Sequence, residues 1–277
     1  MTMWTLSAFA DEIDDDLEMQ CQTLQRLAIE WIELRSAWGV NVSDFDAAML
    51  ADARAVLDRY DIKVSSIGSP IGKIGVTESF EPHLERFENV LKVAAELEAP
   101  FVRVFSFFIP EGDDPDRHRT EVLTRMSVLA TLAESRERVL LHENEKHIYG
   151  DVPRRCLDLV ESVASPWLRL TWDSANFVQC GVRPFTDAYA PLRPHVEYVQ
   201  IKDAYLATGE VVPAGIGDGE LVETMRALRD DGFDGYFSLE PHLRSAHSRG
   251  GFSGADLFEK AHSAFTGLLR QEGIDFA

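Results

Sequence analysis

The stretch RVLLHENEKHIYGD, residues 138–151, begins as an apolar strand and ends in a run of ionisable residues. Val139, Leu140 and Leu141 are typical of a strand that is buried on both faces. They lead directly into His142 and Glu143, so the carboxyl end of this strand carries groups that can do chemistry. In parallel α/β folds, ligands bind at the carboxyl ends of the strands. The stretch therefore predicts a parallel sheet with a functional edge.

Seven further segments have the composition of short strands, and a helical segment follows each of the eight. These strands are predicted at residues 5–9, 31–35, 63–69, 101–107, 168–173, 196–203 and 235–240. The sixth helical segment, PFTDAYAPLRPH at 184–195, contains prolines and is the weakest. Eight βα units predict a single (β/α)8 barrel domain over residues 1–277. A doubly wound sheet is the alternative, but it favours a glycine-rich first βα turn, and SAFADEIDD at 7–15 contains no glycine.

Composition narrows the possible partners. The chain has 277 residues and a formal net charge of -20, which disfavours nucleic acid and anionic membranes. We see no signal peptide, and no segment has the roughly 20 apolar residues that cross a bilayer. Cys21, Cys156 and Cys180 are widely spaced and odd in number, which predicts reduced thiols in a cytoplasmic protein.

Three of the predicted strands deliver a carboxylate at or near the carboxyl end: Glu143, Asp173 and Glu240. The seventh strand adds Gln200, a neutral oxygen donor. Three carboxylates at one barrel mouth repel each other unless they bind a cation or hold protons. Carboxylate and amide oxygens are hard ligands, so the pattern predicts one divalent metal, with Mn²⁺ or Mg²⁺ favoured.

The motifs LLHENEKHIYGD, LTWDSANF, YVQIKDA, GIGDGE and FDGYFSLEPH occur in this order along the chain. They resemble the successive motifs of the sugar phosphate isomerase/epimerase family, the xylose-isomerase-like TIM barrels. The resemblance covers nearly the whole chain and implies that Glu143, Asp173 and Glu240 are metal ligands. The fourth ligand of the family is usually a histidine, where this chain has Gln200. Asn176 likewise replaces a histidine that usually faces the substrate.

This resemblance implies a metal-dependent sugar isomerase or epimerase. The metal would polarise a ketose carbonyl and stabilise an enediolate, while Glu143 and Glu240 remove and return the proton on the adjacent carbon. One alternative is a lyase that cleaves 3-keto C-glycosides by β-elimination, as the catalytic subunits of C-glycoside deglycosidases do, with His142 or the nearby His147 as acid or base. A second alternative is a sugar-binding barrel without catalysis.

The expected ligand is a small sugar or sugar derivative. We expect five polar residues near the strand ends to bind it: Ser69, Lys73, Arg103, Asn176 and Lys202. The chain could form a homo-oligomer, or it could pair with a small second subunit as the deglycosidases do.

Overall fold

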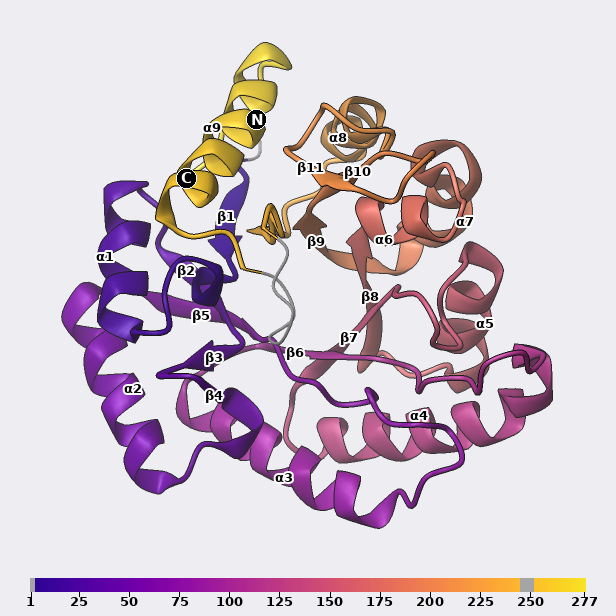
Figure 1. Ribbon diagram of the computed structural model, residues 1–277. Helices are drawn as coiled ribbons and strands as arrows, with labels where there is room; N and C mark the ends of the chain where they lie inside the picture. The colour runs from indigo at the N-terminus through magenta and orange to yellow at the C-terminus, as the bar shows by residue number, and fades with distance from the viewer. Residues whose placement is uncertain (1–2, 245–251) are drawn as a thin grey trace.

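The structure, a computed structural model, describes residues 3–244 and 252–277 (Figure 1). Eight parallel strands are hydrogen-bonded in the order β1-β12-β9-β8-β7-β6-β5-β2 and curl into a nearly closed barrel. The strands are β1 Thr5–Ala8, β2 Trp31–Leu34, β5 Lys63–Ile67, β6 Phe101–Val104, β7 Val139–Glu143, β8 Leu168–Asp173, β9 Val196–Ile201 and β12 Tyr236–Leu239. The predicted (β/α)8 barrel is confirmed, and each predicted strand has its counterpart.

Helices surround the barrel between successive strands (Figure 1). They are α1 Leu17–Arg26, α2 Ala47–Tyr60, α3 Glu81–Glu96, α4 Arg119–Glu134, α5 Pro153–Val163, α6 Ser174–Gln179, α7 Ala190–Leu192, α8 Leu221–Asp230 and α9 Ala255–Gln271. Three of them begin at an aspartate whose side chain accepts a backbone N–H bond: Asp16 before α1, Asp46 before α2 and Asp173 before α6. Such caps satisfy donors that the first helical turn leaves unpaired.

The connection between β8 and β9 is the irregular one. After α6 the chain forms a π-helical turn at Pro184–Tyr189, the short helix α7 and a 3-10 turn at Arg193–His195. Three prolines remove backbone donors from this segment, so it cannot form one continuous helix. Two short hairpins extend other loops: β3 Ser36–Ala37 pairs with β4 Val40–Asn41, and β10 Asp203–Ala204 pairs with β11 Val211–Val212.

The barrel interior below the strand ends is partly polar. The Ser65 hydroxyl lies 2.6 Å from the Ser7 hydroxyl and 2.9 Å from the Tyr198 hydroxyl. These residues belong to β5, β1 and β9, which are not neighbours in the sheet, so the bonds cross the barrel. All three side chains are buried.

The two ends of the chain meet beside the barrel (Figure 1). The Trp4 N–H donates to the Asp275 carbonyl at 2.8 Å, and the Ala277 N–H donates to the Trp4 carbonyl at 2.9 Å. The last residues therefore hold the first strand in place. Among the described residues, no helix has the length and apolar character that a membrane span requires.

Candidate active site at the barrel mouth

Three carboxylates meet at the carboxyl ends of the strands. Glu143 is the last residue of β7, Asp173 is the last residue of β8, and Glu240 follows β12 directly. Each can offer one oxygen such that all three lie within 4.8 Å of one another. Their side chains are at most 3% exposed. Parallel strands that end in one layer thus bring together residues that are 97 positions apart.

Three basic side chains balance these carboxylates. Lys202 Nζ lies 2.9 Å from Asp173 Oδ2 and 3.0 Å from Glu240 Oε2. Arg103 Nη1 lies 3.1 Å from Glu143 Oε2 and 3.7 Å from Glu240 Oε1, so its guanidinium stands between the two glutamates. Arg35, just after β2, donates to Glu240 Oε1 at 2.9 Å. The buried charges are therefore paired, as burial requires.

Protonation equilibria at the site differ from one carboxylate to the next. Burial raises the pKa of Glu143, and the nearby Glu240 charge raises it further against the effect of Arg103. Burial likewise raises the pKa of Asp173 to about 7, although Lys202 opposes the shift. Burial would also raise the pKa of Glu240, but Lys202, His242 and Arg35 together hold it well below its usual value. Of the three carboxylates, Glu240 is therefore the one that stays ionised to the lowest pH.

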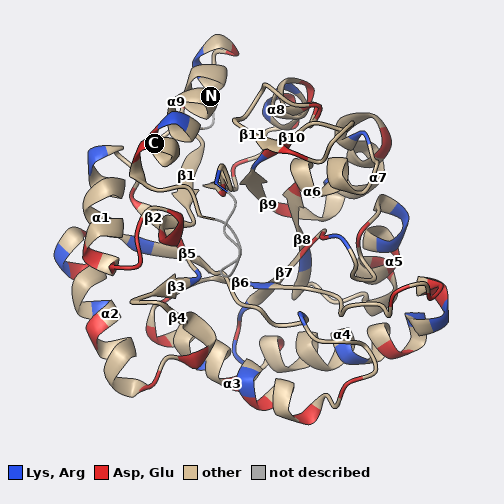
Figure 2. Ribbon diagram, viewed as in Figure 1, with Lys and Arg blue, Asp and Glu red and all other residues tan. Residues whose placement is uncertain are grey.

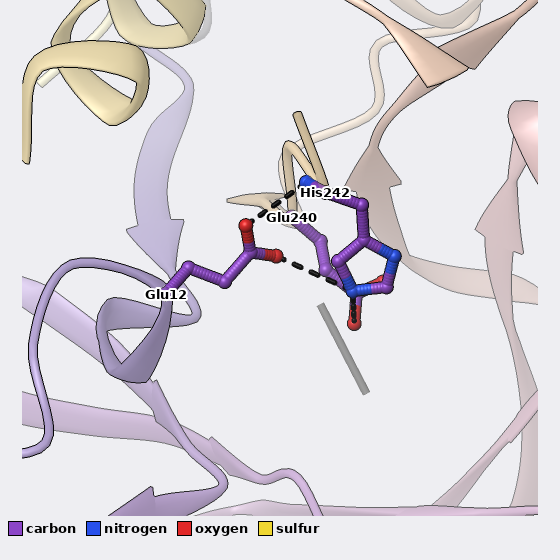
Figure 3. Close-up of side chains that lie close together, drawn as sticks. All are labelled: Glu12, Glu240 and His242. Atoms are coloured by element: carbon purple, nitrogen blue, oxygen red, sulfur yellow. Dashed lines mark hydrogen bonds and ion pairs between the residues drawn. The ribbon is translucent and has the colours of Figure 1, made fainter. Parts of the chain in front are cut away.

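A second cluster shares Glu240 and was not singled out from the sequence (Figure 3). His242 Nε2 lies 3.3 Å from Glu12 Oε1 and 3.3 Å from Glu240 Oε1. The His242 backbone N–H donates to Glu12 Oε2 at 2.9 Å. His242 has a φ of 46°, a strained conformation for a residue other than glycine, and such strain is frequent at functional sites. Glu12 follows β1, so only the fold brings it to Glu240.

Gln200 lies beside Asp173 in the sheet, because β9 and β8 pair with these two residues in register. Its Nε2 donates to Glu33 Oε1 at 3.3 Å. Its Oε1 has no hydrogen-bond partner among the described residues. Burial raises the pKa of Glu33 to about 8, with Arg103 opposing the shift. The sequence did not indicate that Glu33 holds Gln200.

Asn176 contacts the site directly. Its Nδ2 donates to Glu143 Oε1 at 2.8 Å and to the Asn144 carbonyl at 2.9 Å. Its backbone N–H donates to Asp173 Oδ1 at 2.9 Å, so Asp173 also caps α6. Asn144 joins the two strand ends, because its side chain exchanges hydrogen bonds with the Asp173 backbone at 2.9 and 3.1 Å.

A pocket of about 480 Å³ opens over these residues. Lys73, Arg103, Asn176 and Lys202, which were predicted to bind substrate, all line it, as do Glu143 and Glu240. Ser69 does not: its hydroxyl is buried and donates to the Arg103 carbonyl. Ser69 therefore holds the strand that carries Arg103, and it is not among the residues that line the pocket.

His142 is placed outside the pocket as well. Strand β7 continues to Glu143, so alternation turns His142 to the opposite face. The ring is fully buried, and its Nε2 lies 2.9 Å from the Ser106 hydroxyl. Burial lowers the pKa of His142 to about 3. The structure does not bring His142 to the carboxylates, so we leave it out of the mechanism.

The loop after β10 and β11 is fixed by one carboxylate. Asp203 Oδ2 accepts the N–H groups of Gly215 and Gly217 at 2.9 Å, and its Oδ1 accepts those of Gly219 and Ala204 at 2.8 and 2.9 Å. A Cβ atom at Gly217 or Gly219 would lie only 2.5–2.6 Å from Asp203 Oδ1. Glycine is therefore needed at 217 and 219 so that the backbone can approach this carboxylate.

Comparison with known proteins assigns the family. The model of the xylose isomerase-like TIM barrel family matches residues 21–264. The chain belongs to this family. The curated 2-epi-5-epi-valiolone 7-phosphate 2-epimerase of Actinoplanes sp. is 34% identical over 182 residues, which span 64% of this chain and 63% of that enzyme. The match thus covers less than two thirds of the relative's length.

Solved structures share the fold of this xylose isomerase-like barrel. A D-tagatose 3-epimerase-like protein superposes with a TM-score of 0.77 at 16% identity, covering 97% of this chain and 98% of the other. A xylose isomerase-like TIM barrel protein from Mycobacterium smegmatis, in complex with magnesium, gives a TM-score of 0.70 at 19% identity, with 97% and 98% covered.

The donor set of this family member fits a divalent cation. Glu143 Oε2, Asp173 Oδ2 and Gln200 Oε1 are buried and lack a hydrogen-bond partner among the described residues, although the first two contact Arg103 and Lys202. Oxygen atoms of this kind are suited to a hard cation. The Lys202 ammonium contacts both Asp173 and Glu240. A cation that bound these two carboxylates would have to displace the ammonium from them.

Proposed function

We propose that this protein is a divalent-metal-dependent epimerase or isomerase of a keto sugar or a closely related polyol ketone. The observation that carries the proposal is the convergence of Glu143, Asp173 and Glu240 within 4.8 Å. Glu143 and Glu240 also line the polar pocket. The family membership and the 34% identical epimerase support the same class of reaction. Epimerisation is the form that this relative's name favours.

The residues that would hold the cation are Glu143, Asp173, Glu240 and the Oε1 atom of Gln200. Their oxygen-only chemistry favours Mg²⁺ or Mn²⁺ over a softer ion. A bound cation would act as a Lewis acid on the substrate carbonyl and so acidify the C–H bond next to it.

The proton is transferred by the two glutamates. Glu143 and Glu240 lie on either side of the Arg103 guanidinium, with contacts of 3.1 and 3.7 Å. One carboxylate removes the proton from the carbon next to the carbonyl, and the other delivers a proton to the opposite face, which inverts the centre. A positioned general base contributes a factor of roughly 10²–10⁴ to the rate.

The surrounding residues hold these carboxylates in place. Asn176 donates to Glu143, whereas Arg35 and Lys202 fix Glu240. Each glutamate is thus restrained by partners on other elements of the barrel. Preorganisation of this kind reduces the motion that the reaction itself must include.

Lyase chemistry has less support in the structure. Neither of its predicted acids or bases, His142 and His147, is among the residues that line the pocket. His242 lines the pocket instead and contacts Glu240. We therefore keep β-elimination, and binding without catalysis, as outcomes that the experiment must separate.

The test is proton exchange with solvent. Protein loaded with Mn²⁺ is incubated in D₂O with a panel of ketoses, ketose phosphates and 3-keto glycosides, and the metal is removed before NMR spectra are recorded. We expect deuterium at a carbon next to the carbonyl together with an epimer or isomer. Release of an aglycone would replace the proposal by the lyase. Absence of exchange across the panel, in protein that binds the metal, would favour a binding protein.

Two variants assign the roles. Glu143→Gln and Glu240→Gln should each lower exchange by at least about 100-fold, which is the low end of the contribution of a general base. Metal content is measured for each variant, so that loss of the cation is distinguished from loss of the base. The matched control is Glu88→Gln, which removes the same charge from an exposed position on α3.

A further inference from the structure

The pocket over the carboxylates is basic, although the chain carries a net charge of -20. Basic and acidic residues both occur along the helices around the barrel (Figure 2). The pocket lining, by contrast, has six basic residues and three acidic ones, Glu143, Glu145 and Glu240. The basic residues are Arg35, Lys73, Arg103, Lys146, Lys202 and Arg244. This local excess of positive charge runs against the composition of the whole protein.

Three of the six basic residues form ion pairs with Glu143, Asp173 or Glu240, the carboxylates of the proposed metal site. Arg103 pairs with Glu143 and Glu240, and Lys202 pairs with Asp173 and Glu240. Arg35 pairs with Glu240 and with Asp11 at 2.7 Å. The side chains of these three basic residues are at most 10% exposed. They belong to the site that the proposed reaction uses.

The other three, Lys73, Lys146 and Arg244, form an outer group that is exposed to solvent. Lys73 Nζ is 3.5 Å from Glu145 Oε2 and 4.2 Å from the centre of the Phe105 ring. Lys146 Nζ donates to the neutral Gln179 Oε1 at 3.0 Å. Arg244 has no carboxylate partner among the residues that the structure describes. The outer group therefore has three cations against one carboxylate, Glu145.

We propose that Lys73, Lys146 and Arg244 bind a phosphate monoester at the end of the substrate that is remote from the reacting carbon. Three positive charges less the one negative charge of Glu145 leave two, and a phosphate monoester carries about -1.5 to -2 near pH 7. Lysine binds phosphate as a point charge, and arginine adds a planar pair of donors. The proposal rests on the proposed function, since it names the class of substrate for that pocket.

The location of the group suits this role. Glu145 lies two residues beyond Glu143, its Oε2 is 3.5 Å from Lys73 Nζ, and Lys146 follows it directly in the chain. A substrate that spans the pocket would contact the carboxylates at one end and the outer group at the other. The epimerase relative, whose name specifies a 7-phosphate, supports this substrate class.

The experiment measures binding without turnover. Protein treated with EDTA, so that no metal can bind the anion, is titrated with inorganic phosphate and followed by ³¹P NMR. The double variant Lys73→Gln/Lys146→Gln is compared with Lys92→Gln/Lys260→Gln, which removes two exposed lysines from α3 and α9. Circular dichroism is used to check that each variant is folded. We expect this because all four lysines are exposed, so their replacement removes no buried contact.

We expect the pocket double variant to bind phosphate at least about tenfold more weakly, because it loses two charged hydrogen-bond donors. Arg244→Gln should weaken binding in the same direction, and the control should stay within about twofold of the wild type. Equal weakening in both double variants would show a general charge effect and overturn the proposal, as would unchanged binding in the pocket variant.

Acetate provides the second arm of the experiment. If acetate binds as tightly as phosphate and loses affinity in the same variants, the outer group takes a carboxylate and the phosphate assignment is wrong. The phosphate titration involves neither metal nor turnover. The variants can therefore show no effect on phosphate binding while proton exchange is still observed, and the reverse result is equally possible. The two proposals are therefore tested separately.

Discussion

Replacing Lys202 by methionine should uncover the competition between its ammonium and a divalent cation. Lys202 Nζ lies 2.9 Å from Asp173 Oδ2 and 3.0 Å from Glu240 Oε2, and its side chain is 3% exposed. Removing one partner of a buried ion pair costs about 3–5 kcal/mol, because the other charge is left uncompensated. Arg35 still contacts Glu240, so we expect the low end, about 3 kcal/mol, in the presence of EDTA.

Metal should reverse this loss. A ligand present at 100 times its Kd stabilises the folded state by about 2.7 kcal/mol, which nearly offsets the expected cost. The cation no longer has to displace an ammonium from two carboxylates, so Lys202→Met should bind Mn²⁺ at least about tenfold more tightly than the wild type.

The assay is urea denaturation at pH 7.5 with EDTA and with saturating Mn²⁺, combined with calorimetric titration of the metal. Lys92→Met, at an exposed position of α3, is the control for losing a lysine. The reasoning is refuted if Lys202→Met keeps the stability of the wild type in EDTA and binds Mn²⁺ no more tightly.

Three further results are expected. Asp203→Ala leaves four backbone N–H groups without their acceptor, so hydrogen exchange in loop 213–219 should accelerate, and stability should fall by about 1–3 kcal/mol. Burial lowers the pKa of His83, which accepts the Gly72 N–H at 2.7 Å, to about 4. The unfolded chain then binds a proton more readily, so stability should fall as pH decreases from about 6.5 to 4, and His83→Gln should flatten urea midpoints over this range. Glu33→Met removes the acceptor that holds Gln200, so Mn²⁺ affinity measured by calorimetry should fall about 10–100-fold, with Glu33→Gln less affected.

The barrel could be predicted from sequence because its determinants are local. Apolar segments such as 139–141 mark buried strands, and the amphipathic segments between them mark the outer helices. The carboxylates Glu143, Asp173 and Glu240 could also be brought together, since a barrel places all strand ends in one layer. The weak helical segment after β8 was recognised from its prolines, and the structure shows a π-helical turn there.

Other contacts depend on side chains that meet only across the fold. Glu12 and His242 are 230 positions apart and gave no joint signal. The partnership of Glu33 with Gln200 crosses the barrel interior in the same way. The position of His142 depended on whether β7 ended before or after Glu143, and one residue decides which face a side chain takes. Lys202 could be predicted to lie near a strand end, but the contact of its ammonium with two carboxylates could not be foreseen.

The most direct test of a cation at the barrel mouth is anomalous diffraction from crystals grown with Mn²⁺. We predict one strong peak between Glu143, Asp173 and Glu240, with the Gln200 side-chain oxygen facing it and the Lys202 ammonium withdrawn from Asp173. A peak only at another place on the molecule, or no peak while Lys202 still bridges Asp173 and Glu240, would contradict the account.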